Sequence, residues 1–75
     1  MIFVKSSLFK ITNDKFTCGF MFESGFNSTS DITALFEWMK YRGLTGFGVS
    51  HFEQLLFEKE EQALEFKRIY PGMIP

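Results

Sequence analysis

The chain has 75 residues, with eight Lys or Arg against nine Asp or Glu, so its net charge is close to zero. This balance argues against a protein that binds nucleic acid through bulk charge, because phosphate binding depends largely on Lys and Arg. The length predicts one domain, residues 1–75, which buries only about 60% of the surface that its unfolded chain exposes. Eleven Phe supply large apolar side chains for a small core, and a homodimer would bury part of the same surface between two chains.

No membrane segment or signal peptide is expected. The first ten residues include Lys5 and Lys10, which does not fit a signal peptide, and no apolar run approaches the ~20 residues of a membrane span. Cys18 is the single cysteine, so the chain cannot form an internal disulfide. A free thiol is compatible with a reducing compartment. We therefore expect a cytoplasmic protein without membrane contact.

Residues 2–11 and 16–23 are predicted to form a β-hairpin. In the second strand, apolar residues occupy every other position, as expected for a strand with one buried face: Phe16, Cys18, Phe20 and Phe22. Asn13-Asp14 is expected to form a two-residue turn, because both residue types tolerate positive φ. That turn would set Phe9 on the buried face, opposite the cysteine.

After a loop at 24–27, residues 28–43 carry the strongest helix signal in the chain. Four apolar residues fall at i, i+3, i+4 and i+7 and thus share one helical face: Ile32, Leu35, Phe36 and Met39. Ser28, Thr29 and Ser30 offer hydroxyl groups that can cap the first turn, and Gly43 can end the helix in a left-handed conformation.

Trp38 and Tyr41 lie off this apolar face, and two interpretations remain open. They either flank a broad core stripe, as buried aromatic residues usually do, or they stand exposed. In the second case a partner protein would bind the aromatic and basic edge of the helix and its following loop: Trp38, Tyr41, Arg42 and Phe47. Trp, Tyr and Arg are the residue types that dominate the energetics of protein interfaces.

The remaining chain is predicted to hold one more strand and one more helix. Residues 44–50 contain two Gly and are expected to be a loop or an irregular strand. Residues 51–58 are expected to form a strand with both faces partly covered, and residues 59–70 a helix that Pro71-Gly72 ends. The core face of that helix would consist of Ala63, Phe66 and Tyr70. The tail, residues 73–75, is either loose or docked on the core.

The order strand, strand, helix, strand, helix predicts an α+β fold with a small, mostly antiparallel three-stranded sheet. The first helix would cover one face of the sheet, and the second would share that face or cover an edge. Pairing across a two-fold axis would remove one exposed edge, which again favours a homodimer as an alternative.

Residues 46–52 are similar to the RNA-contacting strand of RNA-recognition motifs, with Phe47 and Phe52 in the place of the stacking residues. Thr45 stands where that strand has a basic residue, and Val49 stands where it has an aromatic one. Nucleic acid is therefore not the expected partner. A single-stranded nucleic-acid-binding module that uses Phe47 and Phe52 is kept as the alternative function.

Four carboxylates near the second helix make a local acidic cluster: Glu58, Glu60, Glu61 and Glu65. The cluster is either a solvated helix face or an acidic patch that engages a basic surface of a partner.

No pattern of catalytic or metal-binding residues is present. Cys18 is interpreted as a small core residue, because a nucleophile needs a base beside it and His51 is the single histidine. The chain shows no Ser/His/Asp set, no Gly-rich phosphate loop and no metal-ligand spacing. We therefore predict a protein that is not an enzyme and uses no metal or cofactor.

Residues 52–70 resemble the ending of many small proteins of tailed bacteriophages. In those proteins a strand with alternating aromatic residues runs into Glu-Glu-x-Ala-x-x-Phe-Lys, then a hydrophobic residue and an aromatic one. The matching residues are Glu60, Glu61, Ala63, Phe66, Lys67 and Tyr70. The resemblance implies a phage origin, and by analogy an early protein that binds a host factor or blocks a defence system. The leading hypothesis is thus a non-enzymatic phage protein that binds and occludes a host or viral protein in the infected cell.

Overall fold

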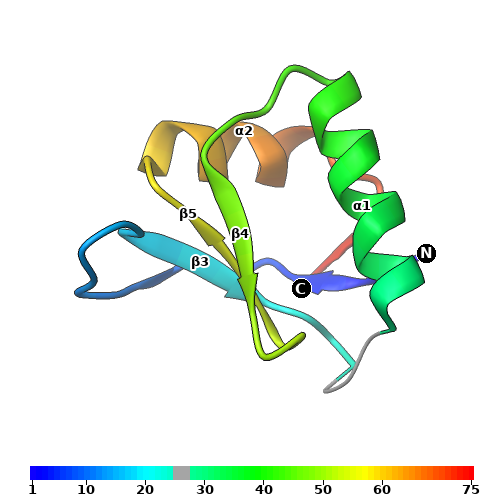
Figure 1. Cartoon of the computed structure of the whole chain (residues 1–75), viewed down its shortest axis with the longest axis horizontal. Coiled ribbons are helices and arrows are strands. Elements are labelled where there is room, and N and C mark those ends of the chain that lie inside the picture. Colours follow the sequence, from blue (N-terminus) through cyan, green and yellow to red (C-terminus); the bar gives the residue numbers. More distant parts are fainter. Residues whose placement is uncertain (25–27) are drawn as a thin grey trace.

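Two helices cover one face of a four-stranded sheet in the computed structural model of the protein (Figure 1). The structure describes residues 1–24 and 28–75, so the loop expected at 24–27 lies outside them except for Ser24. In chain order the elements are β1 (Val4–Lys5), β2 (Phe9–Lys10), β3 (Cys18–Met21), α1 (Thr29–Tyr41), β4 (Phe47–Ser50), β5 (Gln54–Phe57), α2 (Glu60–Ile69) and β6 (Met73–Ile74). This arrangement confirms the predicted α+β class.

The sheet has the strand order β2-β3-β5-β4, and every neighbouring pair is antiparallel. The predicted number of three strands is wrong, because part of the segment 44–50 pairs with β5 as a fourth strand. Since β5 lies antiparallel between β3 and β4, those two strands run parallel to each other, and α1 connects them (Figure 1). The connection places α1 across the sheet face that holds the core.

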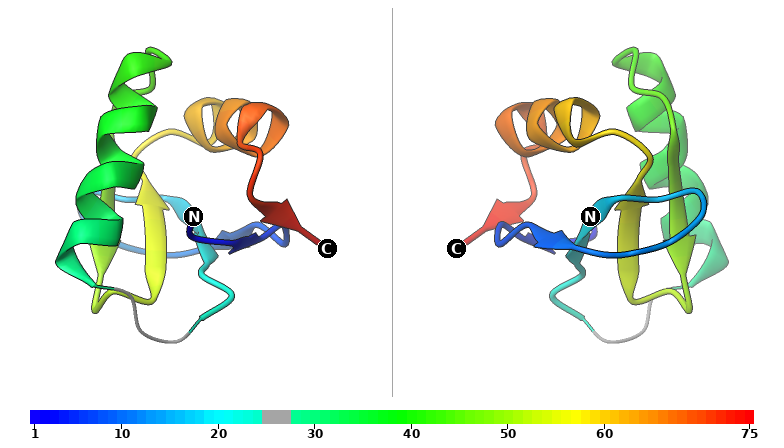
Figure 2. Two further views of the ribbon diagram at one scale, coloured as in Figure 1. Left: turned by 90° about the vertical axis from the view of Figure 1, so that its right-hand side faces the viewer. Right: turned by 90° about the vertical axis from the view of Figure 1, so that its left-hand side faces the viewer.

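The predicted first strand, residues 2–11, is divided between two sheets. β1 pairs in parallel with β6, with Val4 opposite Met73, whereas β2 pairs with β3. The Ser6 amide donates to the Ile74 carbonyl oxygen at 2.8 Å, and the chain then leaves β6. The tail is therefore docked as a strand, and β1 and β6 lie side by side in Figure 2.

The hairpin of β2 and β3 forms one residue out of the predicted register. Phe9 lies opposite Gly19 instead of Cys18. The loop differs from the predicted two-residue turn because Asn13 Oδ1 accepts the Lys15 amide at 2.8 Å. A one-residue shift reverses the face of a side chain, so Phe9 packs on the back of the sheet, away from the helices. Gly19 leaves room there, since a Cβ at this position would lie 3.1 Å from the Phe9 ring.

Phe16 also leaves the face on which it was predicted. Cys18 lies opposite Phe57, and the Thr17 amide donates to the same Phe57 carbonyl oxygen at 2.9 Å. Two residues thus oppose one, which is a β-bulge and breaks the alternation of the strand. The Phe16 ring lies on the back of the sheet over Gly48, where a Cβ would be only 2.8 Å from it.

Of the three residues predicted as possible caps, Ser28 caps α1, and the helix ends at Gly43 as predicted. The Ser28 hydroxyl oxygen accepts a hydrogen bond from the amide of the third helical residue at 3.2 Å. Gly43 has a φ of +82°, and its amide donates to the Lys40 carbonyl oxygen at 3.0 Å. The Leu44 amide donates to the Met39 carbonyl oxygen at 3.0 Å, which completes a Schellman motif.

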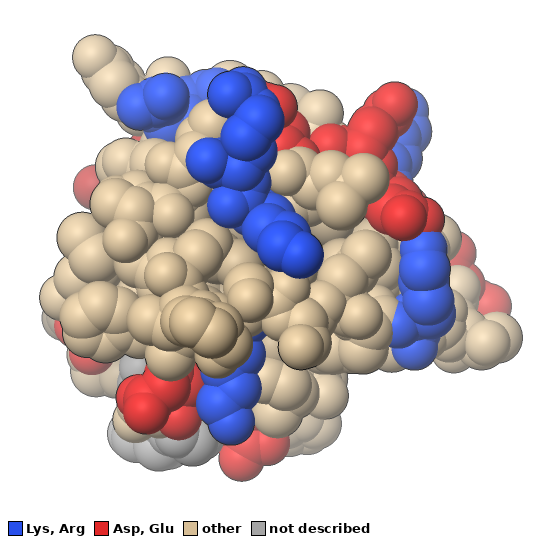
Figure 3. All heavy atoms as spheres, turned by 180° about the vertical axis from the view of Figure 1, so that it is seen from behind, with Lys and Arg blue, Asp and Glu red and all other residues tan. Residues whose placement is uncertain are grey.

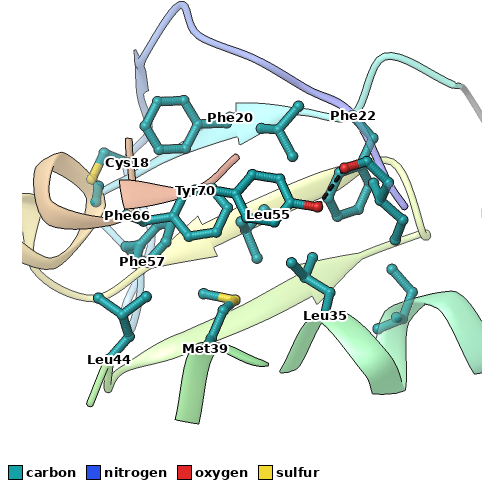
Figure 4. Close-up of a cluster of buried hydrophobic side chains, with 14 residues drawn as sticks. Cys18, Phe20, Phe22, Leu35, Met39, Leu44, Leu55, Phe57, Phe66 and Tyr70 are labelled. Atoms are coloured by element: carbon teal, nitrogen blue, oxygen red, sulfur yellow. Dashed lines mark hydrogen bonds between the residues drawn. The ribbon is translucent and has the colours of Figure 1, made fainter. Parts of the chain in front are cut away.

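α2 shares the helical face of the sheet with α1. Its predicted core face is buried, and Phe66 contacts Phe20 and Phe57 at ring-centroid distances of 6.0 and 5.7 Å. Figure 4 shows these rings between the two helices and the sheet. Tyr70, one turn beyond Phe66, donates its phenolic hydrogen to the Ile2 carbonyl oxygen and so ties α2 to the start of the chain (Figure 4).

β5 is buried on both faces, as the sequence predicts. Leu55 and Phe57 face the helices, and Leu56 lies on the back of the sheet between Gly19 and Gly48. The rings of Phe9 and Phe16, which contact these two glycines, cover that side. Few large side chains are thus enough to bury both faces of the central strand.

Candidate protein-binding surface

Trp38 packs against other aromatic rings, whereas Tyr41 is exposed to solvent. The Trp38 ring packs edge-to-face against Phe66 at 6.3 Å and Tyr70 at 5.1 Å, and Arg42 stands 5.6 Å from its centroid. Trp38 is therefore a partly buried packing residue that joins α1 to α2. Tyr41 is 87% exposed and takes no part in the core.

Phe47 lies on the other side of α1. Its ring contacts Phe36 edge-to-face, with the centroids 4.9 Å apart. Phe36 and Trp38 flank the buried stripe of α1 on opposite sides, because residues two apart on a helix point in very different directions. The structure therefore brings together three of the four predicted partner-binding residues, Trp38, Tyr41 and Arg42, and separates Phe47 from them.

A groove of about 190 Å³ runs along the Trp38 side of α1. Its lining is mainly apolar: Met1, Ile2, Asp31, Ala34, Leu35, Trp38, Tyr70 and Pro71. Ala34 and Trp38 are one turn apart, and Tyr41 and Arg42 continue the same helix flank by another turn. The groove, Tyr41 and Arg42 together form what we call the α1 groove surface.

Sequence reasoning missed Ile2, Ala34 and Pro71 as members of this surface. Ala34 carries no chemical signal, and Ile2 and Pro71 meet only because β1 pairs with β6. The exposed fractions of Met1, 80%, and of Phe3, 49%, add apolar surface at the same end of the chain.

The predicted nucleic-acid pair, Phe47 and Phe52, does not form an exposed platform. The Phe47 ring is engaged by Phe36, as described above, and Phe52 lies in the turn between β4 and β5 rather than in a strand. His51 and Phe52 have positive φ values of +53° and +58°, as in a type I′ turn. Stacking of bases needs aromatic faces open to solvent, and both of these side chains are partly buried.

The predicted acidic cluster is partly neutralised. Glu60 forms an ion pair with Lys10, and Glu65 accepts two hydrogen bonds from Arg68 at 3.0 and 2.5 Å. The hydrogen bond from Arg68 holds the pKa of Glu65 below its usual range. On the face shown in Figure 3, several Lys and Arg side chains lie together toward the top, and Asp and Glu side chains lie beside and below them.

Cys18 and His51 do not meet. Cys18 is fully buried opposite Phe57, and His51 lies in the turn before β5, beyond the other end of that strand. Among residues 1–24 and 28–75, no three His, Cys, Asp or Glu side chains gather as metal ligands. Within this described part of the chain, no helix is long and apolar enough to cross a lipid bilayer.

Three of the six residues that carry the resemblance to phage proteins serve packing in this fold, and the other three are exposed. Ala63, Phe66 and Tyr70 are buried in the core, and Glu60 forms the ion pair with Lys10. No protein-family model matches the chain, and no curated protein or solved structure matches it significantly.

Proposed function

We propose that the protein is a non-enzymatic binding module that docks a partner protein on the α1 groove surface and occludes it. The observation that carries the proposal is the position of the solvent-exposed Tyr41 beside Trp38, Arg42 and an apolar groove. Tyr, Trp and Arg around a pocket are the usual composition of an interface hot spot. Trp38 is held rigid by Phe66 and Tyr70, so its ordering costs little when a partner binds.

The resemblance of residues 52–70 supports a tailed bacteriophage as the source and a host or viral protein as the partner. A small protein of this kind would act by covering a functional surface, since it needs no chemistry of its own to block one. The infected host cytoplasm is the compartment that fits this proposal.

The groove can be tested with substitutions that leave the core intact. We expect Tyr41→Ala to weaken binding of the captured partner at least 10-fold, because truncation of a hot-spot residue costs about 2 kcal/mol or more and a tenfold loss corresponds to about 1.4 kcal/mol. Ala34→Arg should abolish binding by filling the groove. Thr33→Arg is the matched control, because Thr33 is exposed on α1 but does not line the groove.

The measurement is capture of partners from host lysate by the immobilised wild type, followed by titration calorimetry with the purified partner. Circular dichroism should show the same folded spectrum and melting temperature for all variants. Capture of the same proteins by the wild type, Ala34→Arg and Thr33→Arg would reject the groove as the binding site.

A further inference from the structure

The outer edge of β4 is an unprotected end of the sheet. The Glu58 amide donates to the Gly46 carbonyl oxygen at 2.7 Å, so Gly46 points its backbone groups toward β5. Backbone direction alternates along an antiparallel strand, so Gly48 and Ser50 also face β5. The N–H and C=O groups of Phe47 and Val49 therefore point outward. Within residues 1–24 and 28–75, no strand lies beyond β4 (Figure 1).

The two edges of the sheet differ in how they are protected. The edge at β2 has two residues, and one is Lys10, exposed and paired with Glu60. Short strands and lysines are the usual means of preventing edge-to-edge pairing. β4 has four residues, none of them charged, and two are the apolar Phe47 and Val49. Such an edge favours pairing with another strand.

We propose that β4 pairs antiparallel with β4 of a second copy about a two-fold axis at Gly48, so that the protein is a homodimer with one continuous sheet. In this register Phe47 lies opposite the second copy's Val49, and the two residues exchange both backbone hydrogen bonds. Symmetry repeats the exchange, so every outward group of Phe47 and Val49 finds a partner. Pairing Phe47 with Phe47 would place Val49 opposite Thr45, whose amide already donates to Gln62 Oε1 at 3.0 Å, and pairing Val49 with Val49 would place Phe47 opposite His51 in the turn.

The side chains suit this register on both faces. Phe47 and Val49 pack on the helical face, and an aromatic residue directly opposite a β-branched one stabilises a strand pair. On the back, Gly48 meets Gly48 of the second copy without steric cost, and Phe16 already covers it.

A hollow beside the edge would receive the end of the second strand. This hollow, of about 490 Å³, is lined by Phe36, Lys40, Leu44, Thr45, Gly46, Phe47 and Glu58. In the proposed register the second copy's His51 lies opposite Thr45, so its β4–β5 turn approaches the hollow. The α1 groove surface lies on the other side of α1, so a dimer would leave it open to a partner.

The interface is small, and the dimer should be weak. Four paired residues bury less than the ~800 Å² per partner of a standard interface. We expect the mass in sedimentation equilibrium to rise from one chain to two between about 10 μM and about 1 mM protein. Val49→Pro, which removes an outward N–H, should stay monomeric. Val49→Ala is the matched control, because it loses side-chain packing but keeps the N–H, and should still dimerise.

Amide hydrogen exchange on the wild type gives a second readout that needs no variant to fold. The Phe47 and Val49 amides should exchange several-fold more slowly at the highest concentration than at the lowest, in proportion to the fall in the monomer fraction. The Gly48 amide is bonded to β5 in either state and should not change. A monomer at all concentrations, a dimer without this alternating protection, or equal dimerisation of Val49→Pro and Val49→Ala would overturn the proposal.

Discussion

Tyr70 joins α2, α1 and the start of the chain. Its ring stacks on Phe66 at 4.7 Å, meets Trp38 of α1 at 5.1 Å, and its hydroxyl donates to the Ile2 carbonyl oxygen. The spacing along α2 predicts that Tyr70 faces the core. The hydrogen-bond partner could not be predicted, since Ile2 lies 68 residues earlier in the chain.

Burial raises the pKa of Tyr70 above its ordinary value of 10.0. The folded protein then holds this proton more tightly than the unfolded chain, so the stabilisation is fully present below pH 10.0 and is lost as the pH rises through the folded pKa. Tyr70→Phe should lower the free energy of unfolding by about 1 kcal/mol at neutral pH, through the lost hydrogen bond. The difference between wild type and variant should shrink above pH 10.0. Urea unfolding from about pH 8 to about pH 11.5 measures it, and a constant difference would contradict the assignment.

α1 shows how far local signals reach at the scale of an element. Its apolar spacing and its end at Gly43 are readable from neighbouring residues, and the structure confirms both, whereas only the structure selects Ser28 among the three possible capping residues. The hairpin before it was predicted less well. Its register depends on the Asn13 side chain and on the fit of Phe9 over Gly19, which residue pattern alone does not weigh.

A side chain at Gly43 would clash with no neighbouring atom, but the backbone there has a conformation that most side chains disfavour. A Cβ there would meet nothing within 4 Å, while φ is +82°. Gly43→Ala should therefore lower the free energy of unfolding by about 1 kcal/mol, the cost of a left-handed alanine. Gly43→Asn should lower it less, because asparagine adopts this conformation more readily. Chemical denaturation of both variants tests this, and equal losses would show that the effect is not backbone strain.

At the scale of the whole molecule, the first and last strands of the chain pair with each other. β6 pairs with β1, so that Met73 lies opposite the fully buried Val4. Ile2, just before β1, accepts the hydrogen bond from Tyr70. Parallel pairing of the first and last strands brings together residues at opposite ends of the chain. The pairing of β1 with β6 therefore depends on the folded core around the two helices and not on neighbouring residues.

Removal of residues 73–75 should therefore lower the free energy of unfolding by more than the small size of β6 suggests. The truncated chain loses the bond from the Ser6 amide to Ile74 and the cover that β6 gives to Val4, so we expect a loss of about 2 kcal/mol. Removal of Pro75 alone is the control and should change little, because Pro75 is exposed. Thermal unfolding compares the two; similar melting temperatures would mean that β6 contributes nothing to stability.

The sequence by itself determined the α+β class, both helices with the Gly43 end of α1 and the charges of α2, the buried face that Cys18, Phe20 and Phe22 share, and the two-sided burial of β5. These features follow from periodicity and from residues close together in the chain, where propensity and burial act in the same direction. Only the tertiary structure decided the division of the first strand, the fourth strand β4, the shifted hairpin and the bulge that sends Phe16 to the back of the sheet. It also decided that Trp38 is packed while Tyr41 is exposed. Both residues lie at the edge of the apolar stripe of α1, and only the position of α2 determines that Trp38 is the one covered. The open edge of β4 and the α1 groove surface belong to this second group, since each depends on which strand or helix ends up beside it.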